Sequence, residues 1–373
     1  MRSAEMNTPD QMDRDHRFMT RAVELAKRGL YTTKPNPRVG CVVVQGDEIV
    51  GEGWHERAGE PHAEIHALSD AGERAKGSEV FVSLEPCAHS GRTGPCVQAL
   101  VDAGVSRVVA AMIDPNPQVA GRGIEMLRTA GIAAEISQQD CGALDLNPGF
   151  CKRMAGGRPL VRLKVAATMD GRTAANDGSS QWITGEAARA EVHQLRARSC
   201  AIVTGIGTVR EDNPRLNARV DEDVVQPLRV VLDGNGQLDP SARLFSESGD
   251  VLIVTSREDD EGYGFDARTE QLCLAGEDGR VDVAGVLDIL AERACNEVLV
   301  EAGAGVAGAF VSRSLVDEIW VYQSPDMLGS GGRGMFVMRG IRSIDDRVKF
   351  ELKDASRIGR DLRLIYRPTR EGG

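Results

Sequence analysis

Four residues in the first third of the chain have the types and the spacing that hydrolytic chemistry at a metal ion requires. His62 and Glu64 lie in "EPHAEIHAL", and Cys87 and Cys96 lie further along in "EPCAHSGRTGPC". One imidazole nitrogen and two thiolate sulfurs suit a tetrahedral Zn²⁺ ion, and three protein ligands leave the fourth position open for water. The sequence therefore predicts a catalytic zinc site with His62, Cys87 and Cys96 as its ligands.

Two other interpretations of the cysteines compete with this one. The chain has eight cysteines, and in a large protein without an export signal disulfides are rare and most cysteines are small buried residues. Burial suits Cys41 in "VGCVVV", whereas Cys87 and Cys96 follow proline in polar, glycine-punctuated sequence. We expect Pro95 to be the first residue of the helix that carries Cys96, where the helix dipole favours a thiolate.

Glu64 lies two residues past His62, too close for both side chains to bind one ion comfortably. It can instead face the metal-bound water, take its proton, and pass protons to the substrate ring and the leaving amine. An H-x-E motif followed by P-C and a second cysteine, with the glutamate not a ligand, is the arrangement of zinc nucleobase deaminases. Glu64 is therefore the predicted catalytic residue.

The other histidines carry weaker signals. His66 lies one turn into the same expected helix and fits helix packing better than a role in the site. His89 lies between the two cysteines and fits a substrate loop and a plain turn equally well. We interpret His16, His55 and His193 as structural or surface residues.

The elements that must position these residues alternate between strands and helices. Residues 13–29 repeat apolar positions at helical spacing, and short apolar runs bounded by turn residues are typical of buried strands. These runs are "RVGCVVV", "EVFVSL" and "RVVAAM", and between them "HAEIHALSDAG" and "PCVQALVDAG" indicate helices that end at glycine. The pattern predicts a layered α/β domain over residues 1–150.

The alternation restarts after the Gly- and Arg-rich join "FCKRMAGGRP" and predicts a second α/β domain over residues 151–373. The acidic segments 219–226 and 257–280 are expected to be solvated surface loops. The expected strands are "LVRLKVAAT", "CAIVTG", "LRVVLD", "VLIVTS", "EVLVEAG" and "EIWVYQS", and the expected helices span 185–198, 281–294 and 304–315.

Composition excludes several classes of protein. The chain has 373 residues, of which 41% are hydrophobic and 27% charged, as is typical of a soluble α/β enzyme. The sequence shows no signal peptide and no run of about 18 apolar residues, so we expect a cytoplasmic protein without a membrane partner. The net charge of −11 argues against nucleic acid as a partner. A local cluster of arginines could still bind a small anionic substrate, and a homo-oligomer is compatible with the sequence.

The motifs of the first domain resemble those of the bifunctional riboflavin-biosynthesis deaminase–reductases. They are "TTKPNPRVGCVVV", "GEGWHERAGEPHAEIHAL", "LEPCAHSGRTGPC" and "DPNPQVAGRGIEMLRTAGI". Nucleoside and tRNA deaminases usually have C-x-x-C, whereas here eight residues separate Cys87 from Cys96. The resemblance implies a three-layer cytidine-deaminase-like fold, and it implies that Asn36 of "PNP" contacts the substrate ring.

The second domain lacks the G-x-G-x-x-G and G-x-x-x-x-G-K-[ST] signatures of nucleotide-binding loops. "TGIGTV" alone indicates a turn, and "GSGGRG" at 329–334 fits a flexible loop and a binding loop equally well. Together with "KVAATMDGRTA", "SQWITGEAAR" and "VEAGAGVAGAF", however, "TGIGTV" resembles the reductase half of the same family. The resemblance implies a dihydrofolate-reductase-like fold and NADPH as the cofactor. It extends from about residue 13 to 368 and is weakest over 219–280.

The resemblance also implies site residues in the second domain. A 5′-phosphate requires guanidinium groups, for which Arg196 and Arg219 match the family, with Ser180 and Leu216 lining the substrate and Glu301 facing it. The segment "EAGAGVAGA" follows an expected strand and opens an expected helix, so its N–H groups could meet a cofactor phosphate. The residues expected to bind NADPH are Ala166, Trp182, Thr208, Asp212, Gly303, Ala304, Gly305, Val306, Ala307, Gly308 and Ala309.

These features predict an enzyme with Zn²⁺ and NADPH as cofactors and a pyrimidine ribosyl phosphate as its small-molecule substrate. The first domain would deaminate 2,5-diamino-6-ribosylamino-4(3H)-pyrimidinone 5′-phosphate, and the second would reduce the ribosyl group to ribityl. The alternative is a nucleoside or tRNA deaminase with a non-catalytic nucleotide-binding C-terminal domain. The negative charge and the long loop between the cysteines count against that alternative.

Overall fold

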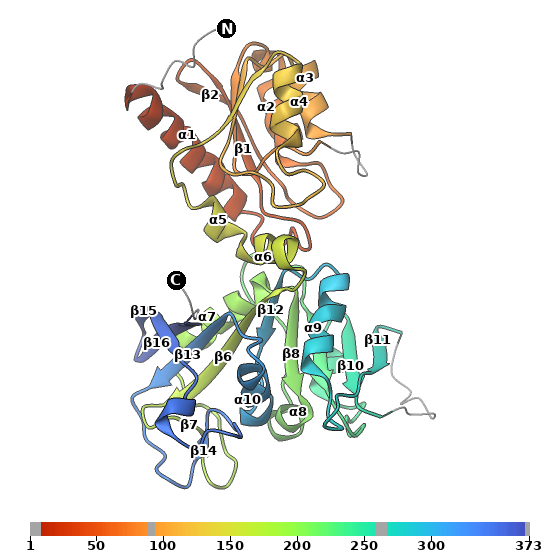
Figure 1. Cartoon of the computed structure of the whole chain (residues 1–373), viewed down its shortest axis with the longest axis vertical. Coiled ribbons are helices and arrows are strands. Elements are labelled where there is room, and N and C mark those ends of the chain that lie inside the picture. Colours follow the sequence, from red (N-terminus) through yellow and green to blue (C-terminus); the bar gives the residue numbers. More distant parts are fainter. Residues whose placement is uncertain (1–8, 89–93, 258–266, 370–373) are drawn as a thin grey trace. The chain divides into compact units, whose positions relative to one another are not determined.

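The computed structural model describes residues 9–88, 94–257 and 267–369 (Figure 1). The chain divides into two compact units, Met1–Gly156 and Gly157–Gly373. The sequence placed the boundary after residue 150, which lies within helix α6 (Pro148–Gly156). None of the helices in the described ranges is long and apolar enough to cross a membrane.

The first unit is built on a mixed sheet of five strands. Their order across the sheet is β2 (Glu48–Trp54), β1 (Gly40–Gln45), β3 (Glu79–Val82), β4 (Arg107–Ala110) and β5 (Ala133–Ile136). β1 pairs antiparallel with both β2 and β3, whereas β3, β4 and β5 run parallel. β1, β3 and β4 are the apolar runs predicted from the sequence.

Helices cover both faces of this sheet (Figure 1). Successive residues of a strand point to opposite faces, and β1 divides its side chains accordingly. Val42 and Val44 lie in a cluster with α1 (Pro9–Lys27). Cys41 and Val43 lie in a second cluster with α2 (Ala63–Ala71), α3 (Cys96–Asp102) and α4 (Arg122–Thr129). The predicted three-layer α/β arrangement of the first unit is confirmed, and the short helices η1 (Gly72–Ala75), α5 (Ala143–Leu146) and α6 complete it.

The second unit is built on a sheet of nine strands. They follow in the order β11 (Thr269–Cys273), β10 (Val251–Thr255), β9 (Leu228–Leu232), β8 (Ala201–Gly205), β12 (Glu297–Val300), β6 (Leu160–Thr168), β13 (Glu318–Ser324), β16 (Asp361–Pro368) and β15 (Phe350–Ile358). The strands from β11 to β13 are parallel neighbours, and β16 runs antiparallel to both β13 and β15. A separate small sheet pairs β7 (Arg172–Ala174) with β14 (Arg333–Gly334), so the "GSGGRG" segment contributes a short strand.

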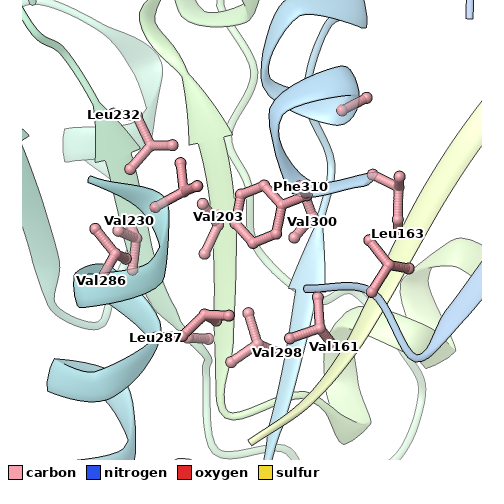
Figure 2. Close-up of a cluster of buried hydrophobic side chains, with 14 of the residues drawn as sticks. Val161, Leu163, Val203, Val230, Leu232, Val286, Leu287, Val298, Val300 and Phe310 are labelled. Carbon is pink, nitrogen blue, oxygen red and sulfur yellow. The ribbon is translucent and has the colours of Figure 1, made fainter. Parts of the chain in front are cut away.

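One face of the large sheet is covered by α9 (Val283–Glu292) and α10 (Ala304–Ser312). Figure 2 shows Leu287 of α9 and Phe310 of α10 among valine side chains of neighbouring strands. Burial of this apolar surface is the main favourable contribution to folding of the unit.

The opposite face of the large sheet carries α7 (Glu186–Arg198) and α8 (Ile206–Asp212). Strand β8 illustrates the division, because Val203 lies in the cluster under α9 and α10 whereas its neighbour Ile202 lies in the cluster under α7. Helices on both faces of a largely parallel sheet confirm the predicted α/β class. The remaining short helices are η2 (Arg243–Ser246) and η3 (Ile344–Asp346).

One sequence prediction about the second unit was wrong. The segment 257–280, expected to be a surface loop, contains strand β11 at the edge of the large sheet. Its side chains are only partly buried, so the strand forms through backbone pairing with β10 rather than through an apolar pattern. Residues 258–266 of the same segment lie outside the described ranges.

Candidate active sites

The three predicted zinc ligands come together in the first unit. His62 is the N-cap of α2, Cys87 lies in the loop after β3, and Cys96 is the first residue of α3, so Pro95 is the N-cap rather than the first helical residue. The ligand atoms all lie within 4.8 Å of one another. His62 Nδ1 is 3.2 Å from Cys96 Sγ and 3.6 Å from Cys87 Sγ. Tetrahedral ligation at about 2.0–2.3 Å separates ligand atoms by about 3.5 Å, so this donor set fits a zinc ion with an open fourth position.

Both cysteines are free thiols, and their surroundings favour a thiolate at Cys87. The backbone N–H of Cys96 donates a hydrogen bond to Cys87 Sγ over 3.2 Å. Hydrogen bonds from the Cys96 thiol and then from His62 lower the pKa of Cys87 to about 4, in spite of burial. The same contact raises the pKa of the Cys96 thiol. Two sulfurs that cannot both ionise without a nearby cation fit a site for a divalent metal, which binds thiols in their deprotonated form.

Glu64 lies in the first turn of α2 and is 3% exposed. Burial and then the charge of Cys87 raise the pKa of Glu64 to about 7, against the lowering effect of His62. A carboxyl group that exchanges protons near neutral pH suits a general acid–base. The helix lies very close to the sheet, because a Cβ on Gly53 of β2 would be only 2.4 Å from the carbonyl oxygen of Ala63.

A buried carboxylate fixes the loop that carries Cys87. Glu85 is 3% exposed, and its oxygens accept hydrogen bonds of 2.8–3.2 Å from the backbone N–H groups of Asp114, Gly121, Gly123 and Ile124. These N–H groups belong to the start of α4 and the segment before it, where an anion is favoured by the helix dipole. A Cβ on Gly123 would lie 2.2 Å from the carbonyl oxygen of Pro86, so glycine is required for this approach.

Asn36, predicted to contact the substrate ring, is held by His55. The Asn36 Nδ2 atom is 3.0 Å from His55 Nε2, and His55 Nδ1 is 3.1 Å from the Pro61 carbonyl oxygen. Because a carbonyl only accepts, Nδ1 carries the ring proton and Nε2 accepts from the Asn36 amide. Burial lowers the pKa of His55, which is 2% exposed, and so keeps the ring neutral. The His55 ring lies 5.4 Å from the His62 ring, which links Asn36 to the ligand cluster.

Sequence reasoning had not singled out His55 as part of the site. Its one signal was its place in the motif "GWHERAGEPHAE", a few residues before the first ligand. His16 and His66 lie half-buried on α1 and α2, and His89 lies outside the described residues.

The second unit holds a cavity of about 810 Å³. It lies at the carboxyl ends of β6, β8 and β12 and is closed by residues that follow these strands, as ligand sites of parallel sheets usually are. Eleven of the residues predicted for the second site line this cavity: Ala166, Ser180, Trp182, Arg196, Thr208, Asp212, Leu216, Arg219, Glu301, Gly303 and Ala304.

The rest of the predicted cofactor segment lies elsewhere. Gly305, Val306, Ala307, Gly308 and Ala309 are not among the residues that line the cavity. Ala307 is buried in the hydrophobic core, and a Cβ on Gly308 would lie 2.0 Å from a backbone carbonyl oxygen. The physical reason is that the helix turns its successive residues in different directions: Ala307 packs in the core, Gly308 lies against the backbone of Val337, and Gly305 is exposed.

Arg196 and Glu301 form a buried, two-pronged ion pair in the cavity wall. Arg196 Nε and Nη2 donate to the two Glu301 carboxylate oxygens over 2.6 and 2.8 Å, and Lys164 Nζ lies 4.0 Å from the same carboxylate. Burial alone would raise the pKa of Glu301, but Arg196 and then Lys164 hold it at about 2. Burial lowers the pKa of Lys164. Sequence reasoning missed Lys164, whose only signal was a charge within the apolar strand "LVRLKVAAT".

Arg219 lies at the same wall and is held through its neighbours. Its Nη1 donates to Asn217 Oδ1 over 2.5 Å, and its backbone N–H donates to His193 Nδ1 over 3.2 Å. Asn217 also accepts a hydrogen bond at its carbonyl oxygen from Arg196 Nη1. Burial, and then Arg196 and Arg219, lower the pKa of His193 to about 4, so the imidazole is neutral at physiological pH.

The residues predicted to bind the cofactor make further contacts at the cavity. Ser180 Oγ donates to Asp212 Oδ1 over 2.9 Å, and the Gly303 N–H donates to Thr208 Oγ1 over 3.1 Å. Trp182 is 71% exposed at the cavity, and the Arg189 guanidinium lies 4.8 Å from its ring centroid. A broad cavity with an exposed indole at one part and guanidinium groups at another fits a planar cofactor ring and an anionic group.

Two family models match the chain. The model described as "Cytidine and deoxycytidylate deaminase zinc-binding region" matches residues 12–112, and the model described as "RibD C-terminal domain" matches residues 159–364. The first match contains His62, Glu64, Cys87 and Cys96, and the second contains the whole cavity wall described above.

Relatives match over almost the whole chain. The "Riboflavin biosynthesis protein RibD" of Escherichia coli K12 is 44% identical over 94% of this chain and 98% of that protein, and the protein of that name from Haemophilus influenzae is 44% identical over 94% and 96%. The structure of Acinetobacter baumannii RibD has a TM-score of 0.89 and 44% identity, covering 96% of this chain and all of that chain. A deaminase/reductase from Thermotoga maritima has a TM-score of 0.86 and 33% identity, covering 96% and 99%. These matches do not favour the alternative of a nucleoside or tRNA deaminase with a non-catalytic second domain.

Proposed function

Because the chain belongs to the RibD family of riboflavin-biosynthesis proteins, which join a deaminase to a reductase, we propose how its residues divide these reactions. The first unit deaminates 2,5-diamino-6-ribosylamino-4(3H)-pyrimidinone 5′-phosphate, and the second reduces the ribosyl group of the product to ribityl with NADPH. The observation that carries this proposal is the presence of both sites in one chain: the His62, Cys87 and Cys96 cluster beside Glu64, and the cavity around Arg196 and Glu301.

In the deaminase unit each side chain has a distinct task. A Zn²⁺ ion held by His62, Cys87 and Cys96 would make bound water nucleophilic at neutral pH. Glu64 takes a proton from the attacking water, delivers a proton to a ring nitrogen, and protonates the amine that leaves as ammonia. Asn36, held by the neutral His55, orients the ring beside Glu64.

In the reductase unit the protein positions two ligands and the cofactor supplies the chemistry. NADPH would deliver a hydride to the sugar carbon. Ala166, Trp182, Thr208, Asp212 and the N-terminal end of α10 hold the cofactor, with Gly303 and Ala304 as its residues at the cavity.

Three of the residues assigned to the substrate are charged: Arg196, Arg219 and Glu301. Ser180 and Leu216 line the sugar, Glu301 faces it, and Arg196 and Arg219 are the guanidinium groups for the 5′-phosphate. Glu301 stays ionised because Arg196 donates a hydrogen bond to each of its carboxylate oxygens. The ion pair adds no net charge to the cavity wall, and its two hydrogen bonds fix the orientation of the guanidinium group.

The test is a pair of assays on the purified chain with a metal analysis. We expect about one zinc ion per chain, release of ammonia from the diaminopyrimidinone substrate, and oxidation of NADPH once the deaminated product has formed. Ammonia release without NADPH oxidation on supplied deaminated substrate would remove the reductase half of the proposal. We further expect a cytoplasmic enzyme whose partners are small molecules rather than nucleic acid or membranes.

A further inference from the structure

We propose that Arg243, together with Arg219, forms the subsite that neutralises the substrate's 5′-phosphate. The proposal rests on the proposed reductase function and names a specificity-determining residue for it. Arg243 is the first residue of η2 and lines the same cavity as Arg219. In sequence it lies 24 positions from Arg219, with no motif around it, so only the fold brings the two together.

The distribution of charge in the cavity wall carries the argument. Arg196 is paired with Glu301, and Arg215 is paired with Glu247 over 3.2 Å. Arg219 and Arg243 form no ion pair with a carboxylate among the residues that the structure describes. The other cationic residues of the cavity are engaged elsewhere: Arg333 with Glu211, Lys164 near Glu301, and Arg189 over the ring of Trp182.

Glu247 cannot serve as the missing partner. Its Oε1 atom forms the ion pair with Arg215 Nε, and its Oε2 atom accepts a hydrogen bond of 2.7 Å from Asn217 Nδ2. Both carboxylate oxygens thus already have partners other than Arg219 and Arg243. The two arginines Arg219 and Arg243 therefore line the cavity without a carboxylate of the described residues in direct contact, although the charge of Glu247 acts on Arg219 from a distance. The two positive charges match a phosphate monoester, which carries close to two negative charges at neutral pH.

Both arginines are connected to one segment of the chain, residues 213–219 between α8 and β9, Arg243 through its backbone and Arg219 through its guanidinium group. The backbone N–H of Arg243 donates to Asn213 Oδ1 over 2.8 Å. Arg219 is held by Asn217 and, through its own N–H, by His193. Arg219 and Arg243 also repel each other: burial, then the charges of Arg196 and Arg215, and finally that of Arg243 lower the pKa of Arg219, against the raising effect of Glu247. An anion between them relieves this repulsion.

The experiment compares the deaminated substrate with and without its 5′-phosphate. Arg243→Met keeps the side-chain stem and removes the charge. For the phosphorylated substrate we expect kcat/KM of NADPH oxidation to fall about 10- to 150-fold, mostly through KM, as for loss of one charge-assisted contact. For the dephosphorylated substrate kcat/KM should stay near the wild-type value. Arg243→Lys should recover part of the loss, since it restores charge without the planar fork.

Arg210→Met is the matched control, because Arg210 is an exposed arginine outside the cavity lining and its loss changes the net charge equally. It should behave as wild type on both substrates. Equal losses on both substrates in Arg243→Met, or no loss on the phosphorylated one, would overturn the proposal.

A binding measurement separates this proposal from the proposed function. Calorimetric titration with ribose 5-phosphate, and with ribose as the control, needs no turnover. If the wild-type chain oxidises no NADPH, the proposed reductase function is wrong. The titration still tests the phosphate subsite in that case, because it measures binding alone. We expect ribose 5-phosphate to bind the wild type more tightly than Arg243→Met; equal binding, or no binding to the wild type, would reject the subsite.

Discussion

Glu64 can be altered in its chemistry without a change in its size. Glu64→Gln keeps the volume and much of the hydrogen bonding of this buried side chain but removes its capacity to take a proton. General acid–base catalysis contributes about 10²–10⁴-fold, and the role proposed for Glu64 includes more than one proton transfer, so we expect ammonia release to fall by at least the upper part of that range. Zinc content, measured by atomic absorption, should stay near that of the wild type. A metal-free variant would show that Glu64 binds or supports the ion instead.

Arg196 is the corresponding test in the second unit. Arg196→Ala removes guanidinium N–H groups from the wall and leaves the Glu301 carboxylate buried without its main partner. A negative charge next to an anionic substrate is unfavourable, so we expect reductase kcat/KM to fall about 10- to 150-fold or more. Arg196→Lys should restore only part, because an ammonium cannot bridge both Glu301 oxygens as the planar fork does.

Three readouts in the same variant make the Arg196 result decisive. NADPH affinity should hold, since the residues assigned to the cofactor are Thr208, Asp212 and the start of α10. Ammonia release should be unchanged. Loss of both activities would identify Arg196 as a residue that the whole fold needs, and weaker NADPH binding alone would move it to the cofactor side of the cavity.

At this scale the sequence predicted residues that belong to compact motifs. Residue type and spacing were enough to identify His62, Glu64, Cys87 and Cys96 as candidates. The structure brings the three predicted ligand side chains within reach of one ion. His55, Lys164 and Arg243 carry no such signal. Each acquires its partner through folding: Asn36 for His55, Glu301 for Lys164, and the segment that bears Arg219 for Arg243.

The contact between α4 and the Cys87 loop gives a prediction at the scale of an element. A methyl group at position 123 would lie 2.2 Å from the Pro86 carbonyl oxygen, which is backbone and cannot give way as the end of a flexible side chain would. We expect Gly123→Ala to push α4 from the loop, weaken the hydrogen bonds to Glu85, and reduce both zinc content and the melting temperature of the first unit. Gly156→Ala is the control, because a Cβ there meets no atom within 4 Å. Full zinc content in Gly123→Ala would show that the loop does not depend on α4.

Elements were predicted where burial imposes a pattern. The parallel strands β6, β8, β9, β10 and β12 are largely buried and appear in the sequence as runs of mostly apolar residues. Strands at sheet edges were missed, and β15 is the clearest example. Most of its side chains are exposed and many are charged, so its sequence resembles that of a surface loop. The strand forms through backbone pairing with β16, which an apolar pattern in the sequence does not reveal.

At the scale of the whole molecule, each unit has its own hydrophobic core. The clusters around α1 and around α2 to α4 draw only on residues before 157, and those around α7 to α10 draw only on residues after it. Elements that share no core residues need not lose stability together. Damage confined to one core or one site should therefore leave the other activity intact.

Cys96→Ser tests this independence together with the metal site. A serine hydroxyl is a poor substitute for a thiolate on zinc, so we expect zinc content and ammonia release to fall together. Oxidation of NADPH on supplied deaminated substrate should continue close to the wild-type rate, because no atom of the cavity in the second unit comes from the altered segment. Cys141→Ser is the matched control, since Cys141 is a free, half-buried cysteine of the same unit outside the ligand cluster. It should keep both zinc and ammonia release. If Cys96→Ser instead abolishes both activities while Cys141→Ser keeps them, the metal stabilises more than its own unit, and the two sites depend on each other in a way that their separate cores do not require.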